Sequence, residues 1–425
     1  MKRIIFLISM ALITLTSFGQ DTYLHCGKIL DVATGKYLTD HTIVVTGNTI
    51  SAIEKGYKTP ANASINVVDL KGKTILPGLI DFHVHIEGES SPTTYLDEFR
   101  LEAADIAFRA QEIAGRTLRT GFTSVRDLGG SGVNIALRDA INRGLVQGPR
   151  IFTAGKAIGT TGGHADPTNG YRSDLAGDPG PAEGVINGVA DARKAVRQRY
   201  KNGADCIKIT ATGGVLSMAH NSQNPQFTLE EIKEICKVAS DYGYHVAAHA
   251  HGDEGMQRAI IGGVKTIEHG TLMSEETMEL MKKHDAYLVP TITAGKEVSI
   301  NAKKPGYFPE RIAQKALEIG PKIQNTFAKA YKKGVGIAFG TDAGVYTHGE
   351  NAREFVYMVE AGMPEIEAIK SATMTNAMIL KKENELGQVK EGFLADIIAV
   401  EGDPLKDISV LGKVDFVMKD GEVIK

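Results

Sequence analysis

The two ends of the chain share a pattern in which apolar and polar residues alternate along short segments. These segments lie between Tyr23 and Leu76, as in HTIVVTGNTISAIEKG, and between Gly387 and Lys425, as in VDFVMKDGEVIK. Alternation with a period of two, interrupted by glycine and asparagine, is typical of antiparallel strands. We therefore expect the two ends to meet in one small β-sandwich formed by residues 20–76 and 386–425.

The middle of the chain, residues 77–385, has a different rhythm. Helical segments end in glycine and a short apolar strand follows at once, as in TGFTSVRD, NGADCIKIT and KGVGIAFGTD. Glycine just after a helix is a frequent C-terminal cap, and helices that alternate with apolar strands indicate parallel βαβ units. The pattern predicts eight strands, at Gly78–His85, Phe122–Asp127, Arg150–Ala154, Asp205–Thr210, Tyr244–His249, Val264–His269, Ala286–Pro290 and Gly336–Asp342.

Eight parallel strands close a (β/α)8 barrel, and about 300 residues is an ordinary size for one with insertions. The predicted fold class is therefore α/β: a (β/α)8 TIM barrel with a small β-sandwich built from both chain ends. A doubly wound open sheet would need a glycine-rich phosphate turn after its first strand, and HVHIEGE is not one. Long loops after the third and seventh strands favour an active site at the carboxyl ends of the strands.

Side chains that can bind a metal stand at the ends of five predicted strands. They are His83 and His85 on the first strand, Lys208 on the fourth, His249 on the fifth, His269 on the sixth and Asp342 on the eighth. Residues two apart share one face of a strand, which places the first two imidazoles side by side. Each histidine alone could be a satisfied core residue, and the lysine could form a salt bridge. Their convergence with one carboxylate favours a metal site, because imidazole and carboxylate suit zinc or similar ions.

With these residues the chain resembles the amidohydrolase superfamily. The matching segments are LPGLIDFHVH, KITATGGVLS, TIEHGT, GTDAGVYTHGENAREF and GFLADIIAVEGDPL. Within the superfamily, these segments most resemble the branch of the metal-dependent Xaa-Pro dipeptidases (prolidases) and the imidazolonepropionases. The resemblance implies two divalent metal ions, with zinc expected. His83, His85 and Asp342 would hold one ion and His249 and His269 the other, with carbamylated Lys208 as the bridging ligand.

The same resemblance implies a hydrolase that cleaves an amide or peptide bond. It would release a C-terminal amino acid from dipeptides or N-acyl amino acids, as a dipeptidase or carboxypeptidase does. Two metals lower the pKa of a bridging water and give hydroxide near neutral pH. Asp342 would be the catalytic residue, because it could accept the proton of that hydroxide and pass it to the departing nitrogen. A lysine suits the bridge because its pKa shifts readily on burial and the neutral amine adds carbon dioxide.

Enzymes of this kind must also bind the carboxylate of the substrate. The candidates are His164 in the long loop after the third strand, His251 two residues after His249, and His348 with Arg353 in THGENARE. The prolidase-like enzymes that this chain resembles have a tyrosine at the position of His251. That departure leaves strict dipeptidase activity open.

Two other classes of function stay open. A mononuclear deaminase or cyclic-amide (imidazolone-type) hydrolase on the same fold would not need Lys208, so the number of bound metals separates it from the first hypothesis. A non-catalytic binding module should have lost metal ligands, and none is missing from the sequence.

The resemblance implies a small-molecule or dipeptide substrate as the partner, and we expect further copies of the chain in a homo-oligomer. The chain is 42% hydrophobic and 23% charged with a net charge of −3, which is ordinary for a soluble globular protein. A nucleic-acid partner would call for a basic patch, and we expect none. The three dispersed cysteines form neither a disulfide framework nor a zinc-finger pattern, and we interpret them as small buried residues.

The N-terminal stretch MKRIIFLISMALITLTSFGQ has the layout of a secretory signal peptide. Lys2 and Arg3 precede an apolar stretch from Ile4 to Leu15, and small residues follow up to Gly19; this order is typical of such leaders. The apolar stretch is shorter than the roughly 20 residues that a spanning helix needs. We expect cleavage near Gly19, removal of residues 1–19, export to the periplasm or beyond, and no stable membrane span afterwards. An uncleaved anchor is the alternative.

Overall fold

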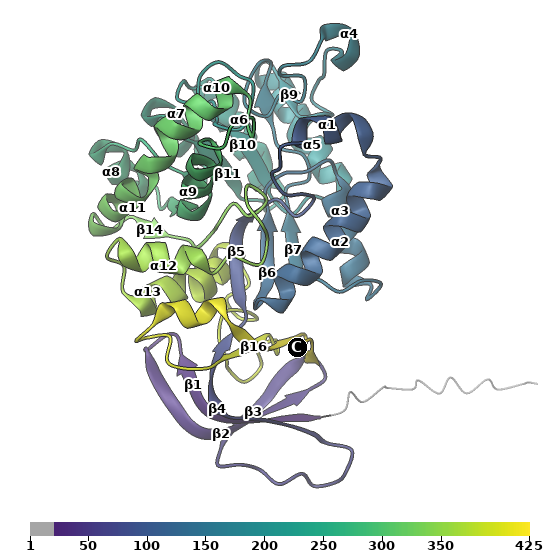
Figure 1. Cartoon of the computed structure of the whole chain (residues 1–425), viewed down its shortest axis with the longest axis vertical. Helices are drawn as coiled ribbons and strands as arrows, with labels where there is room; N and C mark the ends of the chain where they lie inside the picture. The colour runs from purple at the N-terminus through teal and green to yellow at the C-terminus, as the bar shows by residue number, and fades with distance from the viewer. Residues whose placement is uncertain (1–20) are drawn as a thin grey trace, which may run out of the picture.

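The computed structural model describes residues 21–425, so the predicted signal peptide lies outside the described residues. Figure 1 shows a sheet made from both ends of the chain at the base of a larger body of strands surrounded by helices. Within residues 21–425, no helix combines the length and the apolar character that crossing a membrane requires.

The two ends of the chain form one seven-stranded sheet. In bonded order its strands are β17 (Glu422–Val423), β16 (Val414–Lys419), β15 (Ile397–Val400), β4 (Asn66–Pro77), β1 (Thr22–Asp31), β2 (Lys36–Thr46) and β3 (Thr49–Lys55). Neighbours are antiparallel except β1 and β4, which pair in parallel. The sheet is therefore mixed, and not antiparallel throughout as the alternation suggested. The reason is that the chain after β3 crosses over and β4 pairs with the far side of β1.

The sheet curls back on itself and encloses a core of its own. Ile50 N donates to Phe393 O at 2.9 Å and Ala395 N donates to Asn48 O at 2.8 Å, so the β3 edge is bonded to the segment that leads into β15. The enclosed side chains include Leu24, Cys26, Ile43, Val45, Ile75, Ile397, Phe416 and Met418. All three cysteines are free, and Cys236 is only partly buried.

Eight further strands form the barrel, as predicted. They are β5 (Leu79–Val84), β6 (Phe122–Asp127), β7 (Arg150–Thr153), β10 (Ile207–Thr210), β11 (Val246–Ala250), β12 (Thr266–His269), β13 (Tyr287–Val289) and β14 (Gly336–Ile337). Their pairing is parallel within the sets β5-β6-β7 and β10 to β14. Several are a few residues shorter than the sequence pattern predicts. β14 ends at Ile337, so Asp342 follows the strand at a distance of five residues.

Hydrogen bonds at two seams close these sets into a ring. Between β5 and the residues after β14, Phe82 N donates to Phe339 O at 2.9 Å and Asp342 N donates to His83 O at 2.7 Å. Between β7 and β10, Ile158 N donates to Lys208 O at 2.8 Å. The barrel is thus complete, and the second of these bonds places Asp342 directly beside His83.

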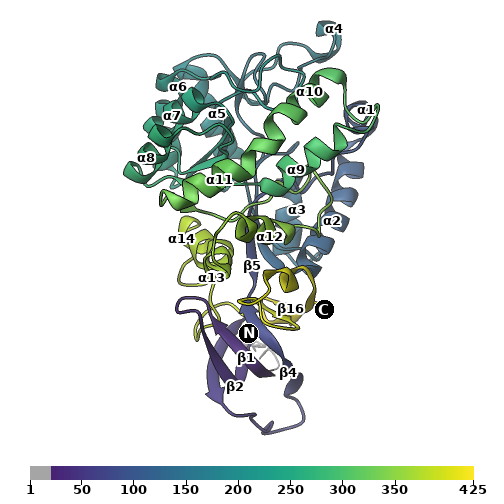
Figure 2. The same ribbon diagram turned by 60° about the vertical axis from the view of Figure 1, so that its left-hand side comes forward.

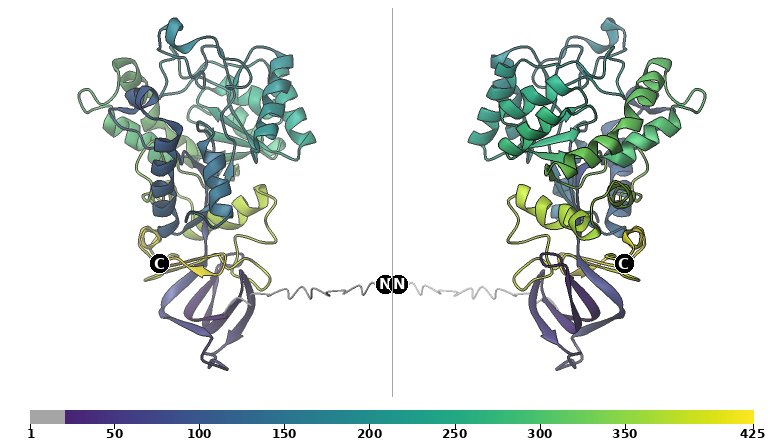
Figure 3. Two further views of the ribbon diagram at one scale, coloured as in Figure 1. Left: turned by 90° about the vertical axis from the view of Figure 1, so that its right-hand side faces the viewer. Right: turned by 90° about the vertical axis from the view of Figure 1, so that its left-hand side faces the viewer.

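Helices surround the barrel on its outside (Figures 2 and 3). They are α1 (Thr94–Arg100), α2 (Ala103–Arg119), α3 (Val133–Asn142), α4 (Ser173–Ala176), α5 (Val189–Asn202), α6 (Leu229–Asp241), α7 (Asp253–Gly262), α8 (Glu275–Lys283), α9 (Ile292–Asn301), α10 (Glu310–Ile319), α11 (Ile323–Lys332), α12 (Arg353–Glu360), α13 (Glu365–Lys370) and α14 (Asn376–Ile379). Glycines cap helices as the sequence predicts: Gly203 ends α5 and Gly263 ends α7, both with left-handed backbone conformations. The short strands β8 (Gly159–Thr160) and β9 (Val185–Ile186) pair within the long loop after β7.

Candidate active site

The six predicted metal ligands lie together at the carboxyl ends of the barrel strands. The ring centroid of His83 is 5.4 Å from that of His85 and 5.2 Å from that of His269. The rings of His269 and His249 are 4.7 Å apart. The amine of Lys208 joins this group, with Nζ at 3.4 Å from Nε2 of His83. Four strands, β5, β10, β11 and β12, and the segment after β14 therefore bring titratable side chains to one small volume.

Asp342 completes the group and has an unsatisfied oxygen. Its Oδ1 lies 3.4 Å from Nε2 of His83 and 3.3 Å from Nε2 of His85, yet this buried atom has no hydrogen-bond partner. One ligand atom each from His83, His269 and Asp342 lie within 4.8 Å of one another. A buried carboxylate oxygen without a partner needs an explanation, and a bound cation supplies one. Burial alone would raise the pKa of Asp342, but the nearby His83, His85 and Lys208 hold it below its usual value.

Each of the four histidines has one ring nitrogen in contact with a fixed partner on its outer side. The pairs are His83 Nδ1 with Glu268 Oε2 (2.8 Å), His85 Nδ1 with Gly129 O (2.8 Å), His249 Nε2 with Gly213 O (3.1 Å) and His269 Nδ1 with Thr291 Oγ1 (2.7 Å). Carbonyl and carboxylate oxygens only accept, so in the first three pairs the named nitrogen carries the proton and the other nitrogen keeps its lone pair. Metal-binding histidines are typically oriented in this way, which makes the residues present a good fit for a metal.

Three residues of this region have strained backbone conformations. His269, Thr291 and Asp342 adopt φ values of 71°, 50° and 57°, in the left-handed region that residues other than glycine seldom enter. Such conformations persist only where the surrounding structure enforces them, and they cluster at functional sites. At His269 and Asp342 the strain falls on two of the six converging residues.

A buried ion pair supports His83 from behind. Glu268 Oε1 accepts from Nη2 of Arg126 at 2.9 Å while its other oxygen holds His83, and both members of the ion pair are fully buried. Arg126 also donates through Nε to Phe82 O at 2.7 Å. Burial would raise the pKa of Glu268, but Arg126, His83 and Lys208 lower it to about 2. Sequence reasoning missed both residues. The available signal was an acid within the apolar strand TIEH and a base within TSVRD.

Glu354 is a second supporting residue that the sequence reasoning missed. Its carboxylate accepts from the backbone N–H of Ile292 at 2.7 Å and of Thr293 at 2.8 Å. These are the first residues of α9 and directly follow Thr291, whose hydroxyl contacts His269. The contact therefore fixes the position from which Thr291 orients the imidazole.

Lys208 is buried, with a relative exposure of 4%. Burial lowers its pKa to about 8. The neutral amine is therefore reached nearer to neutral pH than it is for an exposed lysine.

Two of the four predicted substrate contacts lie against the cluster. The ring of His164 packs on that of His249 at 4.4 Å, and its Nδ1 is buried without a hydrogen-bond partner. The ring of His251 stacks on that of His269 at 5.1 Å, with Nδ1 at 2.9 Å from Thr271 Oγ1. Burial lowers the pKa of His164 to about 3 and that of His251 to about 4. Both rings are therefore neutral and can each donate one N–H.

The other two predicted substrate contacts face different surroundings. The Nε2 of His348 contacts His85 O at 3.2 Å, and its Nδ1 contacts Thr117 Oγ1 at 3.0 Å. Both ring nitrogens are thus used in holding the segment behind His85. The guanidinium of Arg353 is paired with Glu297 and Glu350 and is one-third exposed. The structure brings neither side chain into the cluster.

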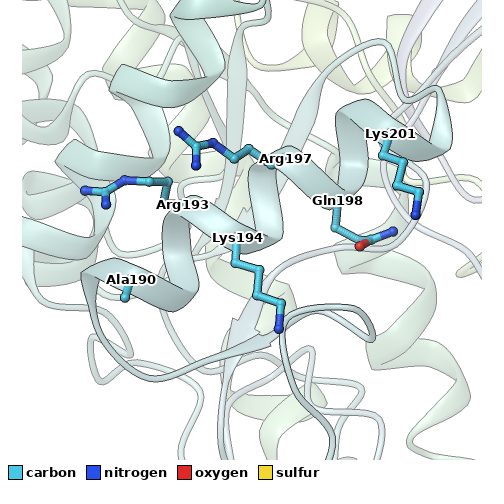
Figure 4. A pocket seen from close by; sticks show the side chains of 6 residues that line it. All are labelled: Ala190, Arg193, Lys194, Arg197, Gln198 and Lys201. Atoms are coloured by element: carbon cyan, nitrogen blue, oxygen red, sulfur yellow. The ribbon is translucent and has the colours of Figure 1, made fainter.

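A hollow on the outside of the barrel is unrelated to this cluster. It lies along α5 and is lined by Ala190, Arg193, Lys194, Arg197, Gln198 and Lys201 (Figure 4). Arg193 is paired with Glu234 of α6 at 2.6 Å. The lining of the hollow is basic, so the hollow differs chemically from the histidine cluster at the strand ends.

Solved structures similar to this one include two of direct interest. A Xaa-Pro dipeptidase with methionine bound in its active site is 52% identical, with a TM-score of 0.91 over 95% of this chain and 99% of that one. A prolidase in complex with N-methylphosphonate-L-proline is 33% identical, with a TM-score of 0.87 over the same shares.

Similar curated proteins include an ochratoxinase and an imidazolonepropionase. The ochratoxinase of Aspergillus niger is 34% identical over 368 residues, which cover 83% of this chain and 75% of that protein. The imidazolonepropionase of Fusobacterium nucleatum is 24% identical over 90% of this chain and 91% of its own length. The model of the amidohydrolase family matches residues 74–424. The chain therefore belongs to the amidohydrolase family and is a hydrolase that acts on carbon–nitrogen bonds.

Proposed function

We propose that this protein is a binuclear-metal hydrolase that releases a C-terminal amino acid from dipeptides or N-acyl amino acids. The observation that carries the proposal is the arrangement of four outwardly anchored histidines around the buried Lys208 and the unpaired oxygen of Asp342. The 52% identity with a Xaa-Pro dipeptidase supports a peptide-like substrate.

The residues divide into two sets of metal ligands. His83, His85 and Asp342 would hold one divalent ion, and His249 and His269 would hold the second. Zinc is the ion we propose, because imidazole nitrogens and carboxylate oxygens are its usual ligands. When bound, two such ions lower the pKa of water and polarise the carbonyl of the scissile bond.

Lys208 would be the bridging ligand in carbamylated form. An ammonium at this position would be repelled by any cation bound to the histidines. A neutral amine can instead add carbon dioxide at nitrogen and lose a proton, which yields an anionic carbamate with two oxygens. Its burial and its 3.4 Å distance to His83 support this assignment.

Asp342 would be the catalytic acid–base residue. Its Oδ1 faces two imidazole nitrogens with no hydrogen bond of its own. It would accept the proton of the attacking water and donate that proton to the departing nitrogen, in the manner of a general base that becomes a general acid.

His164 and His251 are the residues that we propose to bind the carboxylate of the substrate. Both rings are neutral and lie directly against the metal-ligand histidines. Each can donate one N–H to an anionic oxygen. Methionine bound in the active site of the similar dipeptidase supports a pocket that accepts an apolar amino acid.

The test is a library of dipeptides and N-acyl amino acids, assayed with zinc-reconstituted protein whose metal content is measured in the same sample. We expect two ions per chain and turnover that releases free amino acids. One ion per chain at full activity would instead assign the protein to the mononuclear deaminases or cyclic-amide hydrolases. A metal-loaded Asp342→Asn protein, run in parallel, identifies any turnover that comes from a contaminating peptidase.

A further inference from the structure

The amine of Lys315, on α10, is buried and surrounded by a single loop. The residue is 7% exposed, and Nζ donates to Gly214 O at 2.8 Å, to Ser217 O at 2.6 Å and to Ala219 O at 3.0 Å. An ammonium has three N–H donors. All three are therefore committed to the segment 213–219, which follows β10 and is called the β10 loop below.

Other residues on the same face of α10 hold the β10 loop and its continuation. Arg311 Nη1 donates to Met218 O at 3.0 Å, and Glu318 Oε1 accepts from Gln223 Nε2 at 2.8 Å. Arg311, Lys315 and Glu318 are four and three residues apart, which places them on one side of the helix. The helix lies at the end of the molecule opposite the seven-stranded sheet (Figure 2). It belongs to the insertion between β13 and β14.

The β10 loop also touches the candidate site. Gly213 O accepts from Nε2 of His249 at 3.1 Å. Gly214 lies so close to His164 that a Cβ at this position would be 2.3 Å from the imidazole. The backbone of one loop thus contacts a proposed metal ligand and a proposed substrate contact.

We propose that Lys315 is a positioning residue that sets the substrate-binding wall of the site. Its three hydrogen bonds hold the β10 loop in the conformation that supports His164 and His249. Without them, three buried carbonyl groups lose their donors and the loop must rearrange to satisfy them. The kinetic consequence rests on the proposed amide hydrolase function, whereas the consequence for the loop does not.

Lys315→Met is the variant of choice, because it keeps the aliphatic stem and removes the three donors. The matched control is Lys329→Met, which alters an exposed lysine on the neighbouring α11. For the best substrate of the library we expect KM to rise about tenfold or more, equivalent to about 1.4 kcal/mol. Because Gly213 O orients His249, zinc affinity should fall as well, so the kinetics are measured at saturating zinc. Under that condition kcat should change little, because Lys315 itself touches neither a metal ligand nor a reacting atom.

Hydrogen exchange supplies a readout that needs no substrate. The amides of residues 213–219 should exchange faster in Lys315→Met and remain at the wild-type rate in Lys329→Met, since exchange reports local opening. Unchanged KM and unchanged exchange in a folded Lys315→Met protein would overturn the proposal. A wild-type protein that hydrolyses no amide would overturn the proposed function alone, and the exchange result would still decide the role of Lys315.

Arg311→Met covers the case in which Lys315→Met does not fold. It removes the single bond to Met218 O at the outer side of the β10 loop, and should raise KM and loop exchange in the same direction by a smaller factor. Wild-type values for both quantities in Arg311→Met would count against the loop as a determinant of binding.

Discussion

The carboxylate of Glu268 lies 2.8 Å from Nδ1 of His83 and links this imidazole to Arg126, with which it forms a fully buried ion pair. The contact fixes which nitrogen of His83 carries the proton and turns Nε2 toward Asp342. The orientation of a proposed metal ligand is thus determined by two residues that would not themselves touch the metal.

Replacing Glu268 with Gln should weaken metal binding without removing a ligand. The amide oxygen can still accept from His83, but the negative charge that increases the basicity of the imidazole is lost and Arg126 is left uncompensated. Loss of such a partner typically lowers metal affinity 10- to 100-fold, and competition with a zinc chelator measures it. Glu279→Gln on the surface of α8 is the control, because its carboxylate pairs only with the exposed Lys282. Equal zinc affinity in both variants would contradict the assignment.

The same carboxylate should make the metal-free protein sensitive to acid. The pKa of Glu268 is about 2 in the folded protein against 4.5 for the free group, so the unfolded state binds its proton first as the pH falls. Its stabilisation is fully present above pH 4.5 and is lost progressively toward pH 2. Between pH 5 and pH 3 the wild type should lose on the order of 2 kcal/mol through this group. Urea unfolding of Glu268→Gln should show a shallower dependence on pH over that interval, and parallel curves would refute the prediction.

Asp342→Asn should keep the fold and much of the metal but lose catalysis. The amide oxygen remains a weak ligand, whereas the group that accepts and returns the proton is gone. A loss of about 10²-fold or more in kcat is expected for a general acid–base residue. Steady-state kinetics with measured zinc content tests this, with the exposed Asp285→Asn as the control. Near-normal turnover in a folded, zinc-loaded Asp342→Asn protein would exclude the proposed proton transfer.

Lys208→Ala should remove the second metal ion and abolish turnover. His249 and His269 are then two neutral ligands, fewer than zinc normally requires. Elemental analysis should fall from two ions per chain to about one, and short carboxylates that occupy the vacated bridge should restore part of the activity. Lys265→Ala is the control, because this partly exposed lysine contacts Asp285 and the ring of Tyr287 and none of the six converging residues. A Lys208→Ala protein with full zinc content and turnover would show that no carbamate bridge is needed.

The barrel and the convergence of its polar residues could be predicted from local patterns. Strand periodicity places His83 and His85 on one face, and closure of parallel strands brings His249 and His269 to the same end. These inferences need only the direction and order of the strands. The crossover that makes β1 and β4 parallel could not be predicted in this way, because no local sequence pattern distinguishes it from a hairpin.

The supporting contacts could not be predicted, because they join residues far apart in the chain. Arg126 and Glu268 are separated by 142 positions, and Lys315 and Gly214 by 101. A similar limit applies to GENAREF, where Arg353 was the predicted contact but its neighbour Glu354 is the residue that turns inward. Consecutive residues of a helix point about 100° apart, so the start of α12 decides which of the two faces the barrel.

The curled sheet has a consequence for the order in which the chain folds. β4 ends at Pro77 and β5 begins at Leu79, so the sheet and the strand that carries the first two histidines form a nearly continuous ribbon. Three of the seven sheet strands, β15 to β17, lie within the last 30 residues. During synthesis the edge of β4 that pairs with β15 therefore stays open until residues 397–400 have left the ribosome. A premature stop before β15 would leave that edge free to pair with other nascent chains, the usual route by which unpaired strands aggregate.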